Sequence, residues 1–134
     1  MKRKKDRNSL FGRLVEVCAH LRSEEGCLWD REQSHRSLLS YLREESEEVA
    51  EAVESGNPED LMEELGDLLY QVIFHSQIAS ENGEFDIYDV VRGITEKLIR
   101  RHPHVFSDIE AGSVQEIKDN WDRIKKKEKE NRKK

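Results

Sequence analysis

A Gly-Asn-Pro sequence between two long amphipathic stretches constrains the fold more than any other feature of the chain. Gly56 suits the position just after a helix, because glycine readily adopts the left-handed backbone that ends one. Asn57 can cap the next helix, and Pro58 fits its first turn. The two predicted helices run from near Ser34 to Ser55 and from Pro58 to near Gly83. So short a connection predicts an antiparallel helical hairpin.

Helical periodicity continues on both sides of this hairpin. A helix is expected over about 10–21, and another from Asp86 until Pro103 ends it. A final helix is expected after Ser113, which begins a capping-box sequence. Strand signals are weak, and no internal repeat or dividing linker is visible. The sequence therefore predicts an all-α fold and a single domain over 1–134.

The CLWD segment at 27–30 is predicted to be a short loop. Gly26 is expected to end the helix before it. Asp30 is expected to cap the helix after it, with Gln33 three residues on in capping-box spacing.

The supply of apolar residues is thin, since 35% of the 134 residues are hydrophobic and 39% are charged. Helices of this composition have narrow apolar stripes. Such a chain often buries the rest of its apolar surface against a copy of itself, so a homo-oligomer is expected.

Charge is distributed unevenly along the chain, whose formal net charge is −6. Residues 1–7 carry a net +4 and residues 118–134 a net +5, which leaves −15 for the segment between them. This acidic middle argues against wrapping nucleic acid and suits binding of a divalent cation. The basic ends near 1–7 and 126–134 are expected to be flexible, and nucleic-acid binding by these ends is the least favoured alternative.

Cys18 and Cys27 form no CxxC motif, and no secretory apolar region follows the basic start of the sequence. No segment approaches membrane-spanning length. These features favour a reducing cytoplasm and no membrane partner.

Two pairs of acids intrude on the apolar faces of the predicted hairpin. On a helical wheel Glu45 falls among the apolar residues of the first helix, and Glu48 lies at their border, one turn away. Glu64 borders the apolar stripe of the second helix, with Asp67 one turn on. The acids predicted to point outward are Glu47, Glu51, Glu54 and Glu63.

Acids this close repel one another, and burial raises their pKa values. A divalent cation removes both penalties, and an all-oxygen ligand set favours Mg²⁺ or Mn²⁺ over zinc. The open alternative is a set of surface acids paired with lysine and arginine. A di-iron site is less favoured, because the one Glu-x-x-His match, Glu32–His35, lies away from these acids. His75 has no acid three residues before it.

Several blocks of the sequence, in order, resemble the MazG-like family of all-α nucleoside triphosphate pyrophosphohydrolases. EESEE at 44–48 and EELGD at 63–67 match the family pattern EExxE, spacer, ExxD. Further agreement comes from the blocks CLWDREQSH, SLLSYLREE, EELGDLLYQVIFH and EKLIRRHPHVF. The likeness runs from about residue 10 to residue 128. Leu28 departs from it, because the family usually has proline there, in a CPWD sequence.

The resemblance implies a dimer, or a dimer of dimers, in which hairpins pack into a four-helix bundle. The residues implied to hold Mg²⁺ are Glu45, Glu48, Glu64 and Asp67. The residues implied to act in catalysis are the EExxE acids Glu44, Glu45 and Glu48. Glu44 is implied to support the metal ligands or to orient the attacking water. Lys97 and Arg101 are implied to contact the triphosphate. Trp121 and Lys125 are implied to approach the nucleotide from the other side.

The chemistry of these side chains agrees with the implied roles. Lys97 and Arg101 share one helical face, so both can reach one phosphate chain. Trp121 can stack on any base. The simpler alternatives are a solvated face for the two cations and a core position for Trp121. Trp29 and Gln33 either line the base pocket or serve in packing and capping.

No GxxxxGK[ST] phosphate loop is present, so a metal and basic side chains have to bind the phosphates. The predicted function is Mg²⁺-dependent hydrolysis of nucleoside triphosphates to the monophosphate and pyrophosphate, in control or house-cleaning of the nucleotide pool. The alternative is a non-catalytic helical module that binds a nucleotide or a partner protein, which the highly charged surface and basic C-terminal end favour.

Overall fold

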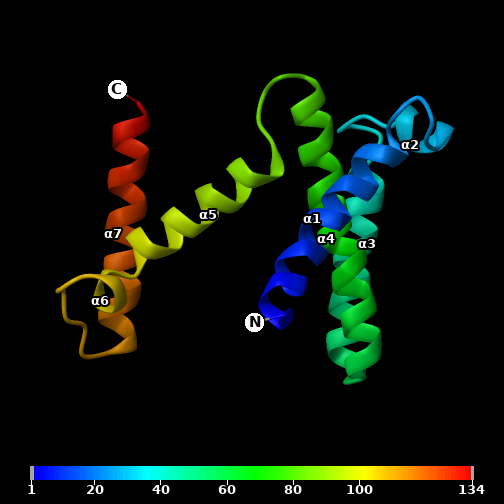
Figure 1. The fold of residues 1–134 in the computed structure, drawn as a ribbon. Helices are drawn as coiled ribbons and strands as arrows, with labels where there is room; N and C mark the ends of the chain where they lie inside the picture. The colour runs from blue at the N-terminus through cyan, green and yellow to red at the C-terminus, as the bar shows by residue number, and fades with distance from the viewer. Residues whose placement is uncertain (1, 134) are drawn as a thin grey trace. The chain divides into compact units, whose positions relative to one another are not determined.

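Helices form every element in the described part of the chain, as predicted. The computed structural model describes residues 2–133, with side chains from Ser9 onward. Two compact units, Met1–Ile87 and Tyr88–Lys134, make up the chain. The first holds α1 (Lys2–Leu21), α2 (Leu28–Glu32), α3 (Leu39–Ser55) and α4 (Pro58–Glu81) (Figure 1). The second consists mainly of α5 (Ile87–Arg101), α6 (Pro103–Phe106) and α7 (Val114–Arg132).

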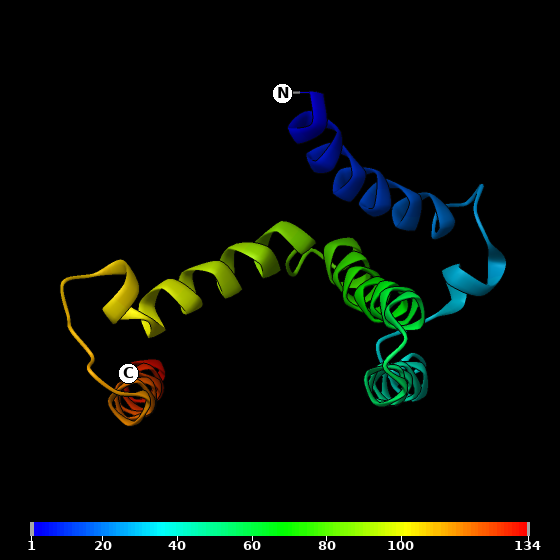
Figure 2. The same cartoon turned by 90° about the horizontal axis from the view of Figure 1, so that it is seen from below.

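The predicted hairpin is confirmed: α3 and α4 lie side by side and antiparallel (Figures 1 and 2). Gly56 ends α3 with a φ of 75°, a left-handed conformation in which a side chain would be strained. Asn57 caps α4, because its Oδ1 accepts from the backbone N–H groups of Glu59 (2.9 Å) and Asp60 (3.4 Å). Pro58 occupies the first turn, where it loses no hydrogen bond. These signals determine where each helix of the hairpin stops and starts.

Three local predictions before the hairpin are wrong. The CLWD segment is not a loop, because Leu28–Glu32 forms the short helix α2. Asp30 is buried inside α2 and does not cap α3. The start of α3 is Leu39 and not near Ser34, because Ser34 and Ser37 form a turn in which each hydroxyl accepts from the other's backbone N–H, at 3.1 and 2.8 Å. Such side-chain bonds compete with the helix for backbone groups.

Arg22 joins the end of α1 to α2 and to the end of α4. Its Nε and Nη2 each lie 2.9 Å from a carboxylate oxygen of Glu81. Its Nη1 donates to the carbonyls of Asp30 (2.6 Å) and Gln33 (3.2 Å), and the guanidinium lies 5.4 Å from the centre of the Phe74 ring. Only 8% of the Arg22 side chain is exposed. Water therefore screens the contacts to the two carbonyls weakly, whereas the Glu81 side chain is 39% exposed and its ion pair is screened more.

The apolar core of the first unit is small. Its buried members are Cys18, Leu38, Ala52, Ile73, Phe74, Ile78, Ala79 and Ile87. The stripe predicted on α4 is only partly buried in a single chain, since Leu65, Leu69 and Val72 remain 40 to 47% exposed. Val53, expected on the apolar face of α3, is also exposed. An apolar face of the hairpin is thus left open to solvent.

The second unit begins and ends its helices close to the predicted positions. The end of α5 is Arg101, and Pro103 starts α6 two residues later. The Ser113 hydroxyl caps α7 by accepting from the backbone N–H of Glu116 at 3.2 Å. The return bond of the predicted capping box is shifted by one residue, because the Glu116 carboxylate accepts from the N–H of Gly112 at 2.7 Å.

Both basic ends are largely helical in the described range, since α1 begins at Lys2 and α7 ends at Arg132. Residues 1 and 134 and the side chains of 1–8 lie outside the described part, so the flexibility of the ends stays a prediction, as does the single domain. No described helix combines the length and apolar character needed to span a membrane.

We expect Arg22→Ala to lower the free energy of unfolding by about 2 kcal/mol, because it leaves the buried carbonyls and Glu81 without their cationic partner. The loss is no larger because Glu81 stays partly solvated. Urea denaturation measures this. The hydrogen bond from Arg22 lowers the pKa of Glu81 from 4.5, so the contribution should be complete above pH 4.5 and fade as the pH falls below it. Arg13→Ala, an exposed arginine of α1, is the control, and equal stability of the two variants would contradict the expectation.

Candidate metal centre

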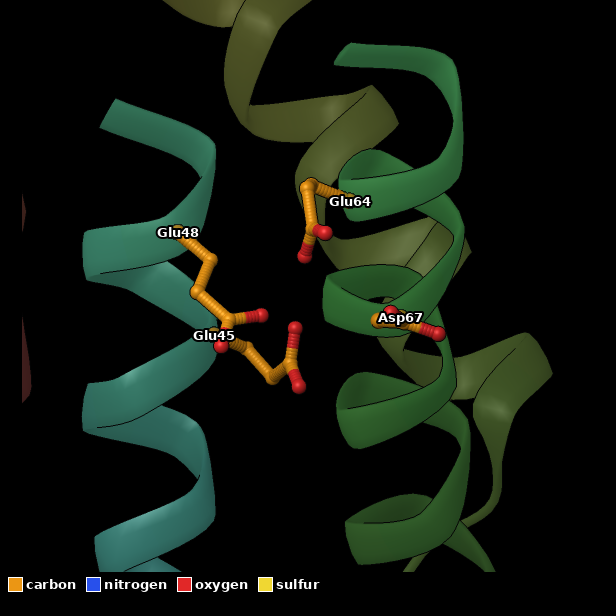
Figure 3. Close-up of side chains that lie close together, drawn as sticks. All are labelled: Glu45, Glu48, Glu64 and Asp67. Atoms are coloured by element: carbon orange, nitrogen blue, oxygen red, sulfur yellow. The ribbon is translucent and has the colours of Figure 1, made fainter. Parts of the chain in front are cut away.

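Four carboxylates predicted from the sequence converge between α3 and α4. One oxygen from each of Glu45, Glu48, Glu64 and Asp67 lies within 4.8 Å of the others. Glu45, Glu48 and Glu64 project into the space between the two helices (Figure 3). These three are half-buried, whereas Asp67 is exposed. Four oxygens at this spacing can surround one metal ion.

The hairpin turn explains why these acids meet. Glu48 and Glu64 lie eight residues before and after Gly56, and Glu45 and Asp67 lie eleven residues before and after it. Residues equidistant from the turn of an antiparallel hairpin lie at the same height, because both helices rise by about 1.5 Å per residue. Each pair on one helix is also one turn apart. The turn thus brings the two pairs face to face.

The cluster is electrostatically unfavourable in the absence of a cation. Oε2 of Glu45 and Oε2 of Glu64 are buried and accept no hydrogen bond from any described residue. Burial, and then the charges of Glu48 and Asp67, raise the pKa of Glu45. Hydrogen bonding with Glu48, burial and the neighbouring negative charges raise the pKa of Glu64 to about 7. Ionised carboxylates only accept hydrogen bonds, so these acids cannot satisfy one another when all are charged.

These residues fit a metal ion. A cation among them would satisfy the buried oxygens and cancel the mutual repulsion. Because all four donors are carboxylates, the site suits a hard divalent cation. No histidine belongs to the cluster found in the described residues, so the Glu-x-x-His pairs of a di-iron site are not assembled there.

A cleft of about 390 Å³ opens beside the cluster, on the side of the hairpin turn. Its lining residues are Glu48, Glu51, Ala52, Ser55, Asp60 and Glu64. Glu51 is exposed as predicted but faces this cleft, and Asp60 was not singled out from the sequence. The spacing could have identified both, because Glu51 follows Glu48 by one turn and Asp60 precedes Glu64 by one turn.

Other acids of the hairpin are exposed, as the helical wheel predicts for Glu47 and Glu54 on α3 and for Glu63 on α4. Glu44, for which the wheel gave no prediction, is exposed as well. Glu44 still influences the cluster, because its charge adds to the raised pKa of Glu45.

In the second unit, Arg101 contacts Trp121, the residue predicted to stack on a base. The Arg101 guanidinium lies 5.0 Å from the centre of the Trp121 ring, and His102 packs edge-on against the same ring at 5.3 Å. Arg101 is only 6% exposed and pairs with Glu128, Nη2 to Oε1, at 2.9 Å. The solvated-face alternative for Arg101 is therefore wrong. Trp121 is half-buried by these contacts.

Lys97 and Arg101 line one cleft of about 450 Å³, as their spacing predicts. The other residues of this cleft were missed by the sequence analysis: Gly93, Arg100, Glu128, Asn131 and Arg132. No spacing rule could have linked Glu128 to Arg101, because 27 residues separate them. Lys125 of α7 is exposed and lies outside the lining.

Trp29 and Gln33 take part in local packing. The Trp29 ring meets Tyr41 edge-on at 5.6 Å. The Gln33 side chain donates to the Trp29 carbonyl at 2.9 Å and accepts from the Ser37 hydroxyl at 2.8 Å, which joins the end of α2 to the turn before α3. Leu28, which departs from the family sequence, is exposed at the start of α2.

The structure also joins two histidines that the sequence analysis treated separately. Nδ1 of His35 and Nδ1 of His75 lie 2.8 Å apart, which requires one of them to donate and the other to accept. Burial, followed by the neighbouring His35, lowers the pKa of His75. The pair ties the turn before α3 to α4.

Residues 33–106, more than half of the chain, match the MazG nucleotide pyrophosphohydrolase domain. The chain belongs to this family. The matching region includes the four clustered acids together with Lys97 and Arg101, whereas Trp29, Trp121 and Lys125 lie outside it.

Curated relatives and a solved structure agree with this assignment. The chain is 51% identical over 125 residues to the nucleoside triphosphate pyrophosphohydrolase/pyrophosphatase MazG of Thermotoga maritima, covering 93% of this chain and 48% of that protein. It is 44% identical over 117 residues to the nucleoside triphosphate pyrophosphohydrolase of Escherichia coli K12, covering 87% of this chain and 44% of that protein. The chain thus spans about half the length of these relatives.

The solved structure is that of a MazG-related protein from Thermotoga maritima. It superposes with a TM-score of 0.70 at 33% identity, covering 86% of this chain and 98% of that one. A likeness of this extent supports the helical fold described above.

We expect removal of one charge from the cluster to stabilise the metal-free protein. In EDTA, Glu64→Gln should raise the melting temperature above pH 7, because the pKa of about 7 means that the ionised carboxyl destabilises the fold there. The gain should shrink as the pH falls from 7 to 4.5, the ordinary pKa, as the folded wild type takes up its proton. Differential scanning calorimetry over this pH range measures the effect.

In excess Mg²⁺ the wild type should melt at a higher temperature than Glu64→Gln, because only the intact cluster gains stability by binding the ion. Glu63→Gln, an exposed acid one residue away, is the matched control and should behave as the wild type does in both conditions. The same Mg²⁺-induced rise in melting temperature in wild type and Glu64→Gln would refute a metal site at the cluster.

Proposed function

We propose that this chain is a Mg²⁺-dependent nucleoside triphosphate pyrophosphohydrolase that releases a nucleoside monophosphate and pyrophosphate. The observation that carries the proposal is the convergence of four carboxylates within 4.8 Å in a chain of the MazG nucleotide pyrophosphohydrolase family. The named relatives are about twice as long as this chain, so their activity is proposed for it and not transferred directly.

Mg²⁺ is the proposed ion, with Mn²⁺ as a substitute, and Glu45, Glu48, Glu64 and Asp67 as its ligands. Carboxylate oxygens are the donors that both ions prefer. When bound, Mg²⁺ supplies the positive charge that draws a triphosphate to an acidic site and polarises its phosphoryl oxygens. The two buried, unpaired oxygens of Glu45 and Glu64 support this choice of ligands.

The remaining roles follow from charge and exposure. Glu44 is exposed beside Glu45, where it is available to orient the attacking water and accept its proton. That water forms a bond to phosphorus while the bond to the pyrophosphate leaving group breaks. Lys97 and Arg101 are proposed to bind the phosphate chain, since both line a basic cleft.

The nucleoside is proposed to contact aromatic and polar side chains. Trp121 and Lys125 lie one turn apart on α7, and the exposed Trp29 ring and Gln33 lie together in the α2 segment. Stacking on tryptophan does not discriminate strongly between bases, so a broad base preference is expected.

A homodimer, or a dimer of dimers, is proposed as the working assembly. Its support is the open apolar stripe of α4, where Leu65, Leu69 and Val72 follow each other at helical spacing and are all exposed. Packing this stripe against a second hairpin would complete a four-helix bundle. A reducing, cytoplasmic setting is also proposed, in keeping with the free thiols of Cys18 and Cys27.

A panel of nucleoside triphosphates with Mg²⁺ tests the activity, with products separated by ion-exchange chromatography. Pyrophosphate and the monophosphate should appear in equal amounts. Glu45→Gln and Asp67→Asn should each lower kcat/KM by about a hundredfold or more, because each removes a proposed metal ligand. Glu63→Gln should retain wild-type activity, because this acid points away from the cluster.

Two results would contradict the proposal. One is orthophosphate as the first product, and the other is full activity in both ligand variants. Binding of nucleotides without turnover across the panel would favour the non-catalytic module.

We expect Leu69→Lys to shift the protein from dimer to monomer, because a charged group in the middle of the α4 stripe cannot be buried without a partner. Size-exclusion chromatography with light scattering over a range of concentrations measures the change. Val114→Lys alters an equally apolar, exposed residue of α7 and is the control. A wild-type chain that is monomeric at every concentration would show that the stripe does not serve dimerisation.

A further inference from the structure

Glu128 of α7 binds two arginines of α5 at the same time. Its Oε1 accepts from Arg101 Nη2 at 2.9 Å, and its Oε2 accepts from Arg100 Nε at 2.6 Å. Arg101 Nε lies 3.5 Å from the same Oε2. The exposed fractions are 16% for the Glu128 side chain and 6% for that of Arg101. Both carboxylate oxygens are therefore used, and the Arg101 guanidinium is almost sealed from solvent.

A phosphate group that binds the Nε–Nη2 edge of Arg101 would need the N–H groups that Glu128 now holds. Carboxylates and phosphates bind the same fork of guanidinium donors, so they compete for it. The face of the Arg101 guanidinium is covered as well, because the Trp121 ring lies 5.0 Å away. A phosphate oxygen can bind this Nε–Nη2 edge of Arg101 only if the Glu128 carboxylate moves aside.

The surroundings of this ion pair favour an anionic ligand. The cleft of about 450 Å³ is lined by Lys97, Arg100, Arg101 and Arg132, with Glu128 as its one acid among the described lining residues. Its size falls within the range of small-molecule sites. Hydrogen bonds from Arg101 and then Arg100 lower the pKa of Glu128 to about 2, so the carboxylate is ionised throughout the neutral range. Glu128 thus acts as a permanent internal anion.

We propose that Glu128 is an internal competitor for the phosphate chain, which occupies Arg100 and Arg101 in the free protein and is replaced by an incoming polyphosphate. This inference rests on the proposed function, in which Lys97 and Arg101 bind the phosphates. Its consequence is a cost that every phosphate anion must meet to displace the carboxylate. The basic cleft attracts a triphosphate, with about four negative charges, more strongly than a monophosphate, with at most two. Glu128 therefore lowers the affinity for both anions by a similar factor, which leaves the more weakly attracted monophosphate product largely unbound.

Calorimetric titration of the full chain with inorganic tripolyphosphate and with orthophosphate, in EDTA, tests the competition. EDTA keeps divalent cations from linking the phosphates to the acid cluster. Glu128→Gln should bind tripolyphosphate about tenfold more tightly than wild type, and the affinity for orthophosphate should rise by a similar factor. The matched control is Glu130→Gln, which removes an equal charge from an exposed position of α7 and should leave both affinities unchanged.

Unchanged or weaker tripolyphosphate binding in Glu128→Gln, relative to Glu130→Gln, would overturn the proposal. Such a result would mean that Glu128 only holds the arginines in place. Circular dichroism checks that α7 is retained. If Glu128→Gln does not fold, Glu128→Asp replaces it, because it keeps the charge while withdrawing the carboxylate from the guanidinium groups, and binding should still tighten.

Turnover by the wild type separates this inference from the proposed function. If wild type hydrolyses no triphosphate while Glu128→Gln binds tripolyphosphate more tightly, the activity fails and the competition stands. If wild type releases pyrophosphate and Glu128→Gln shows no tighter binding, the activity stands and the competition fails.

Discussion

Mutual repulsion among four carboxylates is the interaction on which the rest of the structure depends. Glu45, Glu48, Glu64 and Asp67 converge because the hairpin turn holds the two helices in one register, although two of their oxygens are buried with no partner among the described residues. Apolar residues in place of such acids would favour stability alone. A bound cation would relieve the repulsion, and this links the stability of the first unit to its proposed chemistry.

In the second unit, by contrast, two charged side chains of α5 are paired within the chain. Arg100 and Arg101 are neutralised within the chain by Glu128, and Arg101 is further covered by Trp121. The acids of the hairpin have no cation among the described residues to balance them, whereas the arginines of α5 are already paired. Under the proposed function, a phosphate chain would meet an attractive but occupied site in this unit. Charge pairing of this kind adjusts which anions can bind without altering the helices that carry the site.

Much of the fold and of the metal centre could be predicted, because the relevant signals are local. Gly56 and Asn57 end and begin helices through contacts within a few residues, and the acids follow from helical spacing on either side of that turn. The failures lie in the CLWD segment and in the turn that precedes α3. Asp30 has the chemistry of a helix cap, but it is buried in α2, where Arg22 binds its carbonyl, so tertiary contacts overrode the local preference.

The sequence by itself determined the long helices, the hairpin turn and the set of clustered acids, because periodicity and caps act over one or two turns of chain. Only the tertiary structure decided which charges are already paired. Arg22 meets Glu81 across 59 residues, and Arg101 meets Glu128 across 27. Partners this distant depend on how whole helices pack, and on which side chains that packing removes from water. The helices could thus be predicted from local spacing, whereas the state of Arg101 could not.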